Sequence, residues 1–405
     1  MTAMEQVQIL GNKMIARGMK LAADLIPLRD PELLVGSDAL QRLAQIIADD
    51  SVKKVLLVTG AGIVKRGQTD GLVAALKERG VKTVIYPGIQ PDPTFAIVNE
   101  GLELLQKKSC DAVVGFGGGS AMDAAKVIAI AAANKCKAER LAGYFKGRRK
   151  PLPLYAVPTT AGTGSEVTIA SVISDDSSHA KAFVIDSRSV PRAAALDPRL
   201  MRSVPPALTA ASGMDALTHA LEAYLSTIAT PRTDADAIEA IRLIMENLPR
   251  AYRAGTDLHA RETMAVAAYK AGRAFTRASV GYVHAISHQL GAFYGTPHGL
   301  GNAIVLPYIL EFYEPVVRHR LARLGVELGL GTFNQDKELV TRKVLEHISA
   351  LNKKLQIPLT VAELKAEDIP LIARGAMKEA LTSYPVPRHL TRRQCEDLLH
   401  RMLPG

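Results

Sequence analysis

Three of the chain's ten histidines stand within one short stretch, HAISHQLGAFYGTPH. They are His284, His288 and His298, and the first two are four residues apart. Side chains at that spacing lie on the same face of a helix. An imidazole titrates near neutral pH and is a common metal ligand, so the stretch indicates a metal site or a proton carrier.

A second pair of polar residues with the same spacing lies upstream. Asp215 and His219 occur in GMDALTHALEA, a segment of helical character, and so share one helix face. A carboxylate and several imidazoles that converge form a suitable ligand set for a divalent transition metal, because both zinc and iron(II) accept nitrogen and oxygen donors.

A purely structural interpretation stays open for each of these residues taken alone. A single histidine in an apolar helix is more often a hydrogen-bonded core residue than a ligand. An aspartate near a helix start is usually a cap or part of a solvated face. Three histidines grouped with an Asp-x-x-x-His pair favour the metal.

A glycine-rich loop points to an anionic ligand. GFGGGSAMDAAK, residues 115–126, follows a predicted strand and opens a predicted helix. Consecutive glycines let backbone N–H groups approach a ligand, and a helix N-terminus favours negative charge. Ser120 and Asp123 also have the spacing of a capping box. The loop matches neither G-x-G-x-x-G nor the Walker pattern, so a structural turn is an equally good interpretation of it alone.

A second loop, PTTAGTGSE at residues 158–166, leaves another predicted strand. Its hydroxyls and flexible backbone suit phosphate and sugar recognition at the carboxyl ends of parallel strands. A turn rich in Ser and Thr would look the same. Two such loops at one edge of a sheet favour a dinucleotide site.

A parallel sheet is needed to position these loops, and the first half of the chain predicts one. Short apolar runs alternate with helical runs, with strands at 53–60, 82–88, 110–116 and 153–160 and helices at 71–80, 95–108 and 120–134. This alternation is typical of an α/β fold. We expect residues 1–204 to form an α/β dinucleotide-binding domain.

The second half of the chain changes its periodicity. Apolar residues recur at helical spacing in 236–248, 264–275 and 337–355. Two late segments begin with the capping-box pattern, Thr360-x-x-Glu363 and Thr391-x-x-Gln394. We expect residues 205–405 to form an all-helical metal-binding and substrate domain, with a cleft between the two domains. The first thirty or so residues carry no functional motif and are compatible with an amphipathic helix.

Composition excludes several classes of protein. Hydrophobic residues make up 48% of the chain and charged residues 22%, as in folded globular proteins. No apolar run is long enough to span a membrane, and the N-terminal residues lack a secretory signal pattern. The net charge of +10 is scattered and there is no Trp, which argues against nucleic-acid binding. Three distant cysteines without a CxxC pair are typical of a cytoplasmic protein.

Four motifs occur in the order seen in a known family: GGGSAMDAAK, PTTAGTGSEVT, GMDALTHALEAY and GYVHAISHQLGAFYGTPHGLGNA. The sequence resembles the iron-containing (group III) alcohol dehydrogenases over about residues 35–310. The resemblance implies a metal-dependent alcohol dehydrogenase or aldehyde reductase that uses NAD(H) or NADP(H). It implies Fe²⁺ as the metal, with Zn²⁺ or another divalent ion possible, and a homodimer or higher homo-oligomer.

The resemblance also implies roles for individual residues. Four residues occupy the positions of the family's metal ligands: Asp215, His219, His284 and His298. His288 matches a histidine beside the metal and near the nicotinamide, where an imidazole suits a proton relay. The residues implied in cofactor binding are Gly60, Asp92, Gly118, Gly119, Ser120, Ala121, Met122, Asp123, Thr159, Thr160 and Lys181.

Two of these positions depart from the family pattern. Asp92 stands where the family often has Asn. NAD-preferring relatives often have an acidic residue at the end of the first strand, where it holds the ribose diol, and this chain has Gly60. Glycine leaves room for a 2′-phosphate, with Lys65 and Arg66 nearby in sequence as cationic partners. We therefore hypothesise that NADP(H) is tolerated or preferred.

The expected reaction transfers a hydride between the nicotinamide and a small alcohol or aldehyde. Two other enzymes of the same fold remain alternatives, a dehydroquinate synthase-like lyase and a maleylacetate reductase-like enzyme. The complete Asp-plus-three-His set argues against both. A non-catalytic nucleotide-binding protein is the third alternative.

Overall fold

The structure is a computed structural model that describes Gly11, residues 28–176 and residues 181–404. The expected N-terminal helix lies almost entirely outside these residues. The chain divides into two compact units. We call Leu28–Val204 with Gly255–Gly272 the α/β unit, and Pro205–Ala254 with Arg273–Gly405 the helical unit.

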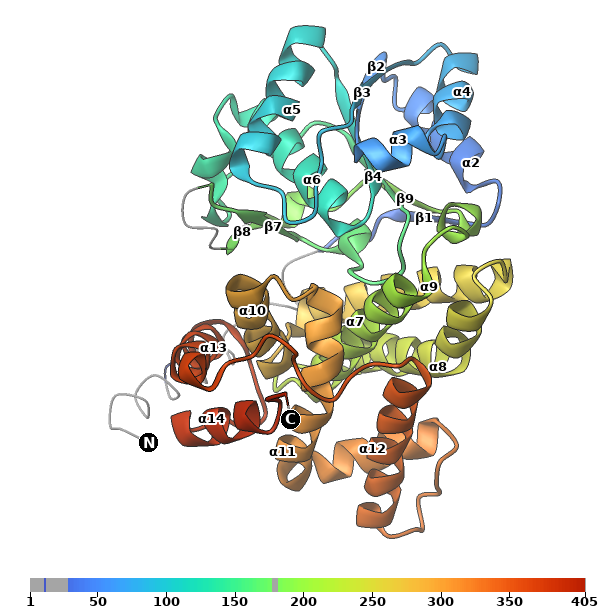
Figure 1. Ribbon diagram of the computed structural model, residues 1–405. Coiled ribbons are helices and arrows are strands. Elements are labelled where there is room, and N and C mark those ends of the chain that lie inside the picture. The colour runs from blue at the N-terminus through green and yellow to red at the C-terminus, as the bar shows by residue number, and fades with distance from the viewer. Residues whose placement is uncertain (1–10, 12–27, 177–180, 405) are drawn as a thin grey trace. The chain divides into compact units, whose positions relative to one another are not determined.

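A six-stranded parallel sheet runs through the α/β unit (Figure 1). Its strand order is β1-β9-β6-β4-β2-β3, and every neighbouring pair is parallel. The strands are β1 (Glu32–Val35), β2 (Lys54–Val58), β3 (Lys82–Tyr86), β4 (Ala112–Gly117), β6 (Leu154–Pro158) and β9 (Ala193–Leu196). The predicted parallel α/β fold is confirmed. The sequence did not reveal β1 and β9, which have four residues each.

A smaller sheet of order β5-β8-β7 also belongs to this unit. Its strands are β5 (Gly143–Tyr144), β7 (Ala170–Ser174) and β8 (Lys181–Ile185), and β7 pairs with β8 in antiparallel fashion. The helices of the unit that precede Pro205 are α2 (Ala39–Asp49), α3 (Ala61–Lys65), α4 (Asp70–Glu78), α5 (Phe95–Lys108) and α6 (Gly119–Asn134). The described residues of the unit also form the 3₁₀ turns η1 (Ala138–Leu141), η2 (Ser165–Val167), η3 (Ser187–Ser189) and η4 (Pro198–Met201).

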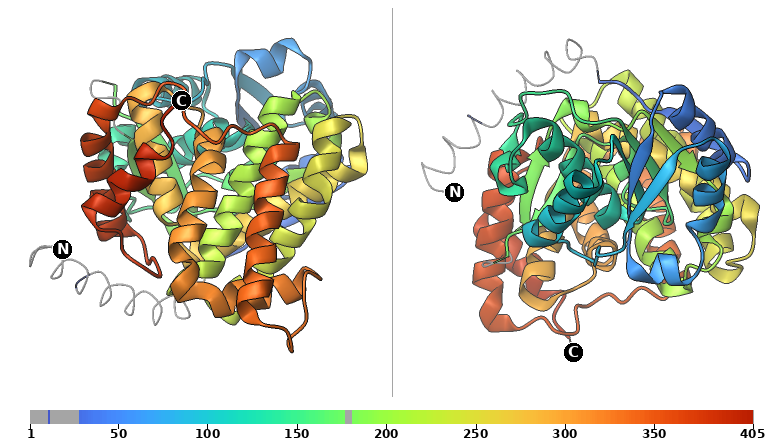
Figure 2. Two further views of the ribbon diagram at one scale, coloured as in Figure 1. Left: turned by 60° about the horizontal axis from the view of Figure 1, so that its bottom comes forward. Right: turned by 90° about the horizontal axis from the view of Figure 1, so that it is seen from above.

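Helices account for all regular structure in the described residues after Pro205. They are α7 (Pro206–Leu225), α8 (Pro231–Arg253), α9 (Leu258–Ala278), α10 (Tyr282–Tyr294), α11 (His298–Glu327), α12 (Lys337–Lys354), η5 (Ala366–Asp368), α13 (Ile369–Ser383) and α14 (Arg392–His400). Helix α7 packs against α8 and α11, and α11 packs against α12 (Figure 2). The predicted all-helical character is confirmed.

One of the two late capping boxes is present and the other is not. Thr391 accepts a hydrogen bond from Gln394 N, and the Gln394 side chain bonds back to Thr391 N, at the start of α14. Thr360 instead lies in a bend, and the next helix begins only at Ala366. The second prediction was wrong because a four-residue pattern carries no information on whether a packed helix follows it.

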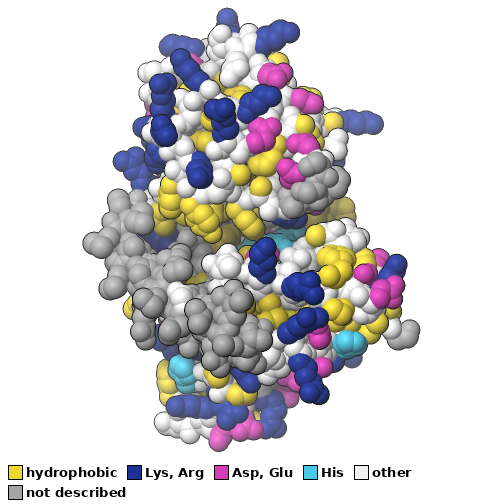
Figure 3. All heavy atoms as spheres, turned by 90° about the vertical axis from the view of Figure 1, so that its left-hand side faces the viewer, with side chains coloured by type: hydrophobic (Ala, Val, Ile, Leu, Met, Phe, Trp, Pro, Cys, Tyr) yellow, Lys and Arg dark blue, Asp and Glu magenta, His cyan; other side chains and the backbone are white. Residues whose placement is uncertain are grey.

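Among the described residues on the side drawn in Figure 3, charged side chains of both signs are visible. Dark-blue Lys and Arg side chains lie at separate places on that face, with acidic side chains among them. No helix among the described residues is long and apolar enough to cross a membrane.

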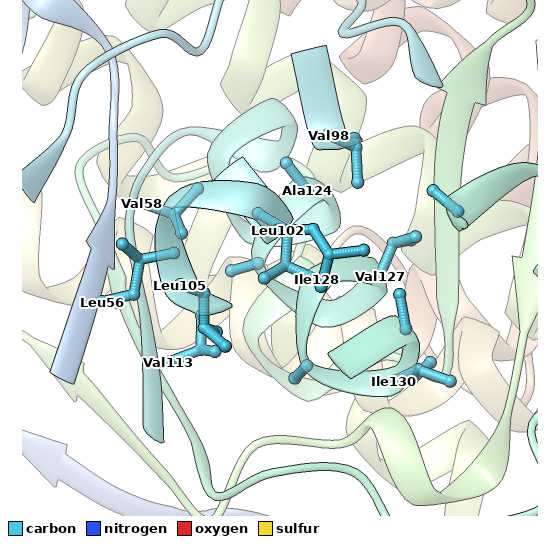
Figure 4. Close-up of a cluster of buried hydrophobic side chains, with 14 of the residues drawn as sticks. Leu56, Val58, Val98, Leu102, Leu105, Val113, Ala124, Val127, Ile128 and Ile130 are labelled. Atoms are coloured by element: carbon cyan, nitrogen blue, oxygen red, sulfur yellow. The ribbon is translucent and has the colours of Figure 1, made fainter. Parts of the chain in front are cut away.

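The core of the α/β unit follows from alternation along its central strands. Leu56 and Val58 point to one side of the sheet and pack with α5 and α6 (Figure 4). Val55 and Leu57 point to the other side and pack with α2 and α4. Successive side chains of a strand face opposite sides, so a strand buried on both sides reads as a continuous apolar run.

Candidate metal centre and glycine loops

Three helices of the helical unit bring a carboxylate and three imidazoles together. Asp215 and His219 lie one turn apart on α7, His284 lies on α10, and His298 is the first residue of α11. One donor atom from each of these four residues lies within 4.8 Å of the other three. Residues separated by more than sixty positions in sequence therefore form one cluster, which we call the four-donor cluster.

The distances within this cluster suit a single cation. Asp215 Oδ1 lies 3.9 Å from His219 Nε2, 3.8 Å from His284 Nε2 and 3.4 Å from His298 Nε2. Ligands at about 2.1 Å from a tetrahedral ion stand about 3.4 Å from one another. Three nitrogen donors and one carboxylate oxygen are also the donor types that zinc and iron(II) accept. The residues therefore fit a divalent transition metal.

Burial prepares these donors to bind a cation. The side chains of Asp215 and His284 are 4% and 3% exposed, whereas that of His298 is 33% exposed and leaves one side open. Burial, together with the neighbouring imidazoles, holds the pKa of His284 well below its usual range. A neutral ring offers a lone pair, which is the form that a metal needs.

Aromatic stacking fixes the ring of His219. Its centroid lies 4.2 Å from that of Phe275 and 4.6 Å from that of His284. Two further aromatic side chains lie on α10, where Phe293 is 40% exposed and Tyr294 donates a hydrogen bond to Asp368.

Two residues that sequence reasoning missed contact the four-donor cluster. Asn302 Nδ2 lies 2.7 Å from Asp215 Oδ1 and 3.2 Å from both His284 Nε2 and His298 Nε2. Glu222 Oε2 lies 2.6 Å from His284 Nδ1. Helical spacing carried a signal for both, since Asn302 follows His298 by four residues and Glu222 follows Asp215 by seven.

His288 lies beside the cluster rather than within it. Its ring stacks on that of His298 with centroids 5.2 Å apart. Its Nδ1 lies 2.7 Å from Glu379 Oε1, and the same oxygen accepts a hydrogen bond of 2.5 Å from the hydroxyl of Tyr384. Glu379 and Tyr384 were not foreseen, because they lie more than ninety residues away in sequence.

In the α/β unit, three adjacent strands end at the same edge of the sheet. Gly60 follows β2, Gly118 and Gly119 follow β4, and Thr159 follows β6. Thr159 N donates a hydrogen bond of 2.9 Å to Gly117 O, which ties the two loops together. The expected side-by-side placement of the two loops is present within this unit.

The first turn of α6 departs from the capping box expected of Ser120 and Asp123. Gly118 is the N-cap residue, and no side chain caps the helix. Both Asp123 oxygens are used elsewhere, since Oδ1 accepts from Ser165 Oγ at 2.6 Å and Oδ2 accepts from Val172 N at 2.9 Å. That capping prediction was wrong because the Asp123 carboxylate accepts hydrogen bonds from Ser165 and Val172, which are distant in sequence. Ala121 and Met122 bury their side chains.

A buried lysine lies behind these loops. Lys126 Nζ donates to Ser165 Oγ at 2.9 Å, Thr168 Oγ1 at 2.8 Å and Ala170 O at 3.0 Å. Burial lowers its pKa to about 8, although Asp123 opposes that shift. Burial also raises the pKa of the neighbouring Glu166 to about 7. This network holds α6 against the 158–166 loop.

The remaining expected cofactor residues lie on this unit as well. Lys181 Nζ forms an ion pair of 2.6 Å with Asp92 Oδ1, and Asp92 adopts a left-handed backbone with φ of 51°. Thr160 faces the glycine loop, because a Cβ added to Gly118 would lie 3.5 Å from Thr160 Oγ1. Lys65 ends helix α3 and Arg66 is its C-cap residue, just beyond Gly60.

Comparisons with known proteins bear on both units. The iron-containing alcohol dehydrogenase model matches residues 30–198, and the model described as Fe-containing alcohol dehydrogenase family, C-terminal, matches residues 209–403. Alcohol dehydrogenase 4 of Schizosaccharomyces pombe is 41% identical over 369 residues, which is 90% of this chain and 85% of the relative. NAD-dependent methanol dehydrogenase of Bacillus methanolicus is 38% identical over 354 residues, 87% of this chain and 93% of the relative.

A solved structure agrees with these sequence matches. The crystal structure of a 1,3-propanediol oxidoreductase superposes with a TM-score of 0.89 at 36% identity, covering 92% of this chain and 98% of the other. The resemblance noted from the four motifs is confirmed, and so is the enzyme class that it implied. The chain belongs to the iron-containing alcohol dehydrogenase family and is an oxidoreductase that acts on CH–OH groups.

Proposed function

We propose that this enzyme interconverts small alcohols and aldehydes with a nicotinamide cofactor, using a divalent metal. The residues that would hold the metal are Asp215, His219, His284 and His298, and the observation that carries the proposal is their convergence within 4.8 Å. When bound, the metal supplies Lewis acidity toward the oxygen of the alcohol or aldehyde. Asn302 supports the site by donating to Asp215.

His288 is the residue that we assign to proton transfer. Glu379 engages its Nδ1, so Nε2 is the atom that is free to take up a proton and pass it on. The neighbouring Phe275 presents an apolar ring at His219, which helps to exclude water from the reacting groups. When bound, a nicotinamide would donate the hydride in aldehyde reduction and accept it in alcohol oxidation, and the chain's residues would align it with the substrate carbon.

We propose that residues 1–204 form the dinucleotide-binding domain and residues 205–405 the metal-binding and substrate domain, although Gly255–Gly272 of the latter range belongs to the α/β unit. The chain runs from β2 outward to β3 and then returns to β4 on the other side of β2. Ligands of open α/β sheets bind at the carboxyl ends of strands where the order reverses in this way. Gly60, Gly118 and Thr159 stand at that edge.

The cofactor residues divide by how they contact the ligand. Gly119 and Ser120 begin α6 and present backbone N–H groups at a helix N-terminus, which suits a diphosphate. Ala121 and Met122 take part through the backbone only, because their side chains are buried. Asp123 acts indirectly by holding Ser165. The others we assign are Gly60, Asp92, Gly118, Thr159, Thr160 and Lys181.

NADP(H) is the cofactor form that this chain's departure from the family pattern favours. Gly60 places no carboxylate at the end of β2, and the side chains of Lys65 and Arg66 are exposed one turn later. A carboxylate there would repel a 2′-phosphate, whereas a cation attracts it. We expect kcat/KM with NADPH to exceed that with NADH, and equal values or a clear advantage for NADH would contradict this preference.

The proposal is tested by stripping the metal and reloading the enzyme anaerobically with Fe²⁺ or Zn²⁺. Absorbance of NADPH and NADH is followed with short-chain aldehydes, and metal-dependent decay is expected. Nucleotide consumption would also separate a dehydrogenase from a dehydroquinate synthase-like lyase. Nucleotide binding without turnover under any loading would favour the non-catalytic alternative.

His284→Ala provides the test of the ligand assignment. This variant should lose both the bound metal and turnover, because it removes a buried donor of the four-donor cluster. His347→Ala, on α12 and outside the four-donor cluster, is the matched control and should keep both. Full metal content and activity in His284→Ala would overturn the assignment. Metal content is measured by elemental analysis after gel filtration.

We also propose that the enzyme works in the cytoplasm as a homodimer or higher homo-oligomer. All three cysteines, Cys110, Cys136 and Cys395, are free thiols, as expected in a reducing compartment. Light scattering coupled to gel filtration gives the oligomeric state.

A further inference from the structure

Glu222 contacts His284 of the four-donor cluster at Nδ1, the ring nitrogen that does not belong to the cluster. Its Oε2 lies 2.6 Å from His284 Nδ1, and its Oε1 accepts a hydrogen bond of 2.8 Å from Val283 N. The two side chains are only 4% and 3% exposed, so no solvent competes for the contact. Gly281 allows the close approach, because a Cβ there would lie 2.9 Å from Glu222 Oε1.

We propose that Glu222 is a positioning residue for the metal, which holds His284 in the tautomer and orientation that a metal ligand requires. This inference rests on the metal site proposed above. In its ionised form, which the hydrogen bond from Val283 N favours, Glu222 only accepts hydrogen bonds, and the proton of the neutral ring then resides on Nδ1. The lone pair then resides on Nε2, the atom that lies 3.8 Å from Asp215 Oδ1.

The Glu222 carboxylate has two separate effects on His284: it orients the ring, and its negative charge acts on the ring nitrogens. Hydrogen bonding at Nδ1 fixes the plane of the ring, and the negative charge makes Nε2 a stronger donor to a cation. Replacing such a partner of a metal-binding histidine typically weakens metal binding about 10- to 100-fold. A glutamine at position 222 keeps an oxygen for Val283 N, but it removes the charge and places an NH2 donor where the acceptor for His284 Nδ1 was. The variant therefore disturbs the contact with the histidine and spares the contact with the start of α10.

A matched control is the pair of His288, one helical turn further along α10, and Glu379 on α13. Glu379 Oε1 lies 2.7 Å from His288 Nδ1, so the contact has the same chemistry. His288, however, is not a member of the four-donor cluster. Glu379→Gln therefore removes a carboxylate from a nearby imidazole without touching a proposed ligand.

The experiment measures metal affinity rather than turnover. Metal-free wild type, Glu222→Gln and Glu379→Gln are titrated with Zn²⁺ against a chromophoric chelator, and with Co²⁺ by visible absorption. Glu222→Gln should bind about 10- to 100-fold more weakly and show altered Co²⁺ bands. Glu379→Gln should match wild type within about twofold, and the metal-free Tm of all three proteins should agree within a few degrees.

Equal affinity of wild type and Glu222→Gln would overturn the inference and leave the proposed metal site intact. Equal losses in both glutamine variants would also overturn it, because the effect would then not depend on contact with a ligand. A wild type that binds no metal would refute the proposed function itself.

A measurement on the wild type covers the case in which Glu222→Gln does not fold. Long-range ¹⁵N–¹H correlation spectra of the metal-free protein, in which no metal dictates the tautomer, report which nitrogen of each histidine carries the proton. The signals of His284 are identified as those that disappear in His284→Ala. A proton on Nδ1 is expected, and a proton on Nε2 or a ring with no proton at Nδ1 would overturn the inference.

Discussion

Gly119, the first residue of α6, has no room for a side chain. A Cβ built on it would lie 2.7 Å from Thr163 Cγ2, 3.0 Å from Thr163 Oγ1 and 3.2 Å from Thr163 Cβ. Rotation about χ1 moves the methyl and hydroxyl groups of Thr163 but leaves its Cβ in place. Relief therefore requires the backbone of the 158–166 loop to move, which would disturb the hydrogen bond of 3.2 Å from Ser165 N to Thr163 Oγ1.

We expect Gly119→Ala to lower the free energy of unfolding by about 1–3 kcal/mol, the usual cost of overpacking a close contact. The better helix propensity of alanine offsets at most about 1 kcal/mol of this. Nucleotide binding should weaken as well, because the two loops form the proposed binding edge. If the substitution makes the nucleotide-binding arrangement of the two loops less stable by about 1.4 kcal/mol, the nucleotide binds about tenfold more weakly.

Gly118→Ala is the matched control one residue earlier. Its Cβ would lie 3.5 Å from the nearest atom, Thr160 Oγ1, an ordinary contact distance. The expected loss of stability is below about 1 kcal/mol and reflects the weaker N-cap preference of alanine. Urea unfolding followed by circular dichroism measures stability, and nicotinamide fluorescence measures binding.

Equal stability of the two alanine variants would refute the steric reasoning. The double variant Gly119→Ala/Thr163→Ala provides a further check, because it removes the two shortest of the three contacts. It should recover part of the lost stability, with a coupling energy of about 0.5–2 kcal/mol. Absence of coupling would show that Thr163 is not the residue in conflict.

Two further predictions concern the same unit. Burial raises the pKa of Glu166 from 4.5 to about 7, so between these values the folded protein holds a proton that the unfolded chain has released. The stability contributed by this group therefore falls as pH rises from about 4.5 to about 7, by at most about 1.4 kcal/mol per pH unit. Urea unfolding across that range should show a weaker pH dependence for Glu166→Gln, and equal slopes would contradict the assignment. Gly60→Asp should move the preference from NADPH toward NADH by about 10- to 100-fold, as expected for gain of a charge-assisted hydrogen bond to the ribose and repulsion of a phosphate. Because a Cβ there would lie 3.0 Å from Ile89 O, Gly60→Ala is the steric control, and the same kcat/KM ratio in both variants would contradict the electrostatic explanation.

Local sequence determined the central strands of the large sheet and the faces of the helices. The runs that became β2, β4 and β6 are buried on both sides, so they read as unbroken apolar stretches whatever they pack against. The four-residue spacing of Asp215 and His219 fixes both on one face of α7 before any tertiary contact forms. Convergence with His284 and His298 was expected from the motifs, and the cluster of donor atoms matches that expectation.

Only the tertiary structure shows which hydrogen-bond partners the side chains of the proposed sites have. The carboxyl groups of Glu222 and Glu379 reach His284 and His288 across 62 and 91 positions of the chain. Nothing in the spacing of Ser120 and Asp123 revealed that Ser165 and Val172 would take the carboxylate from the helix cap. Spacing along a helix or strand is a property of the local backbone, whereas a hydrogen bond between distant segments depends on how whole elements pack, and no short stretch of sequence encodes that.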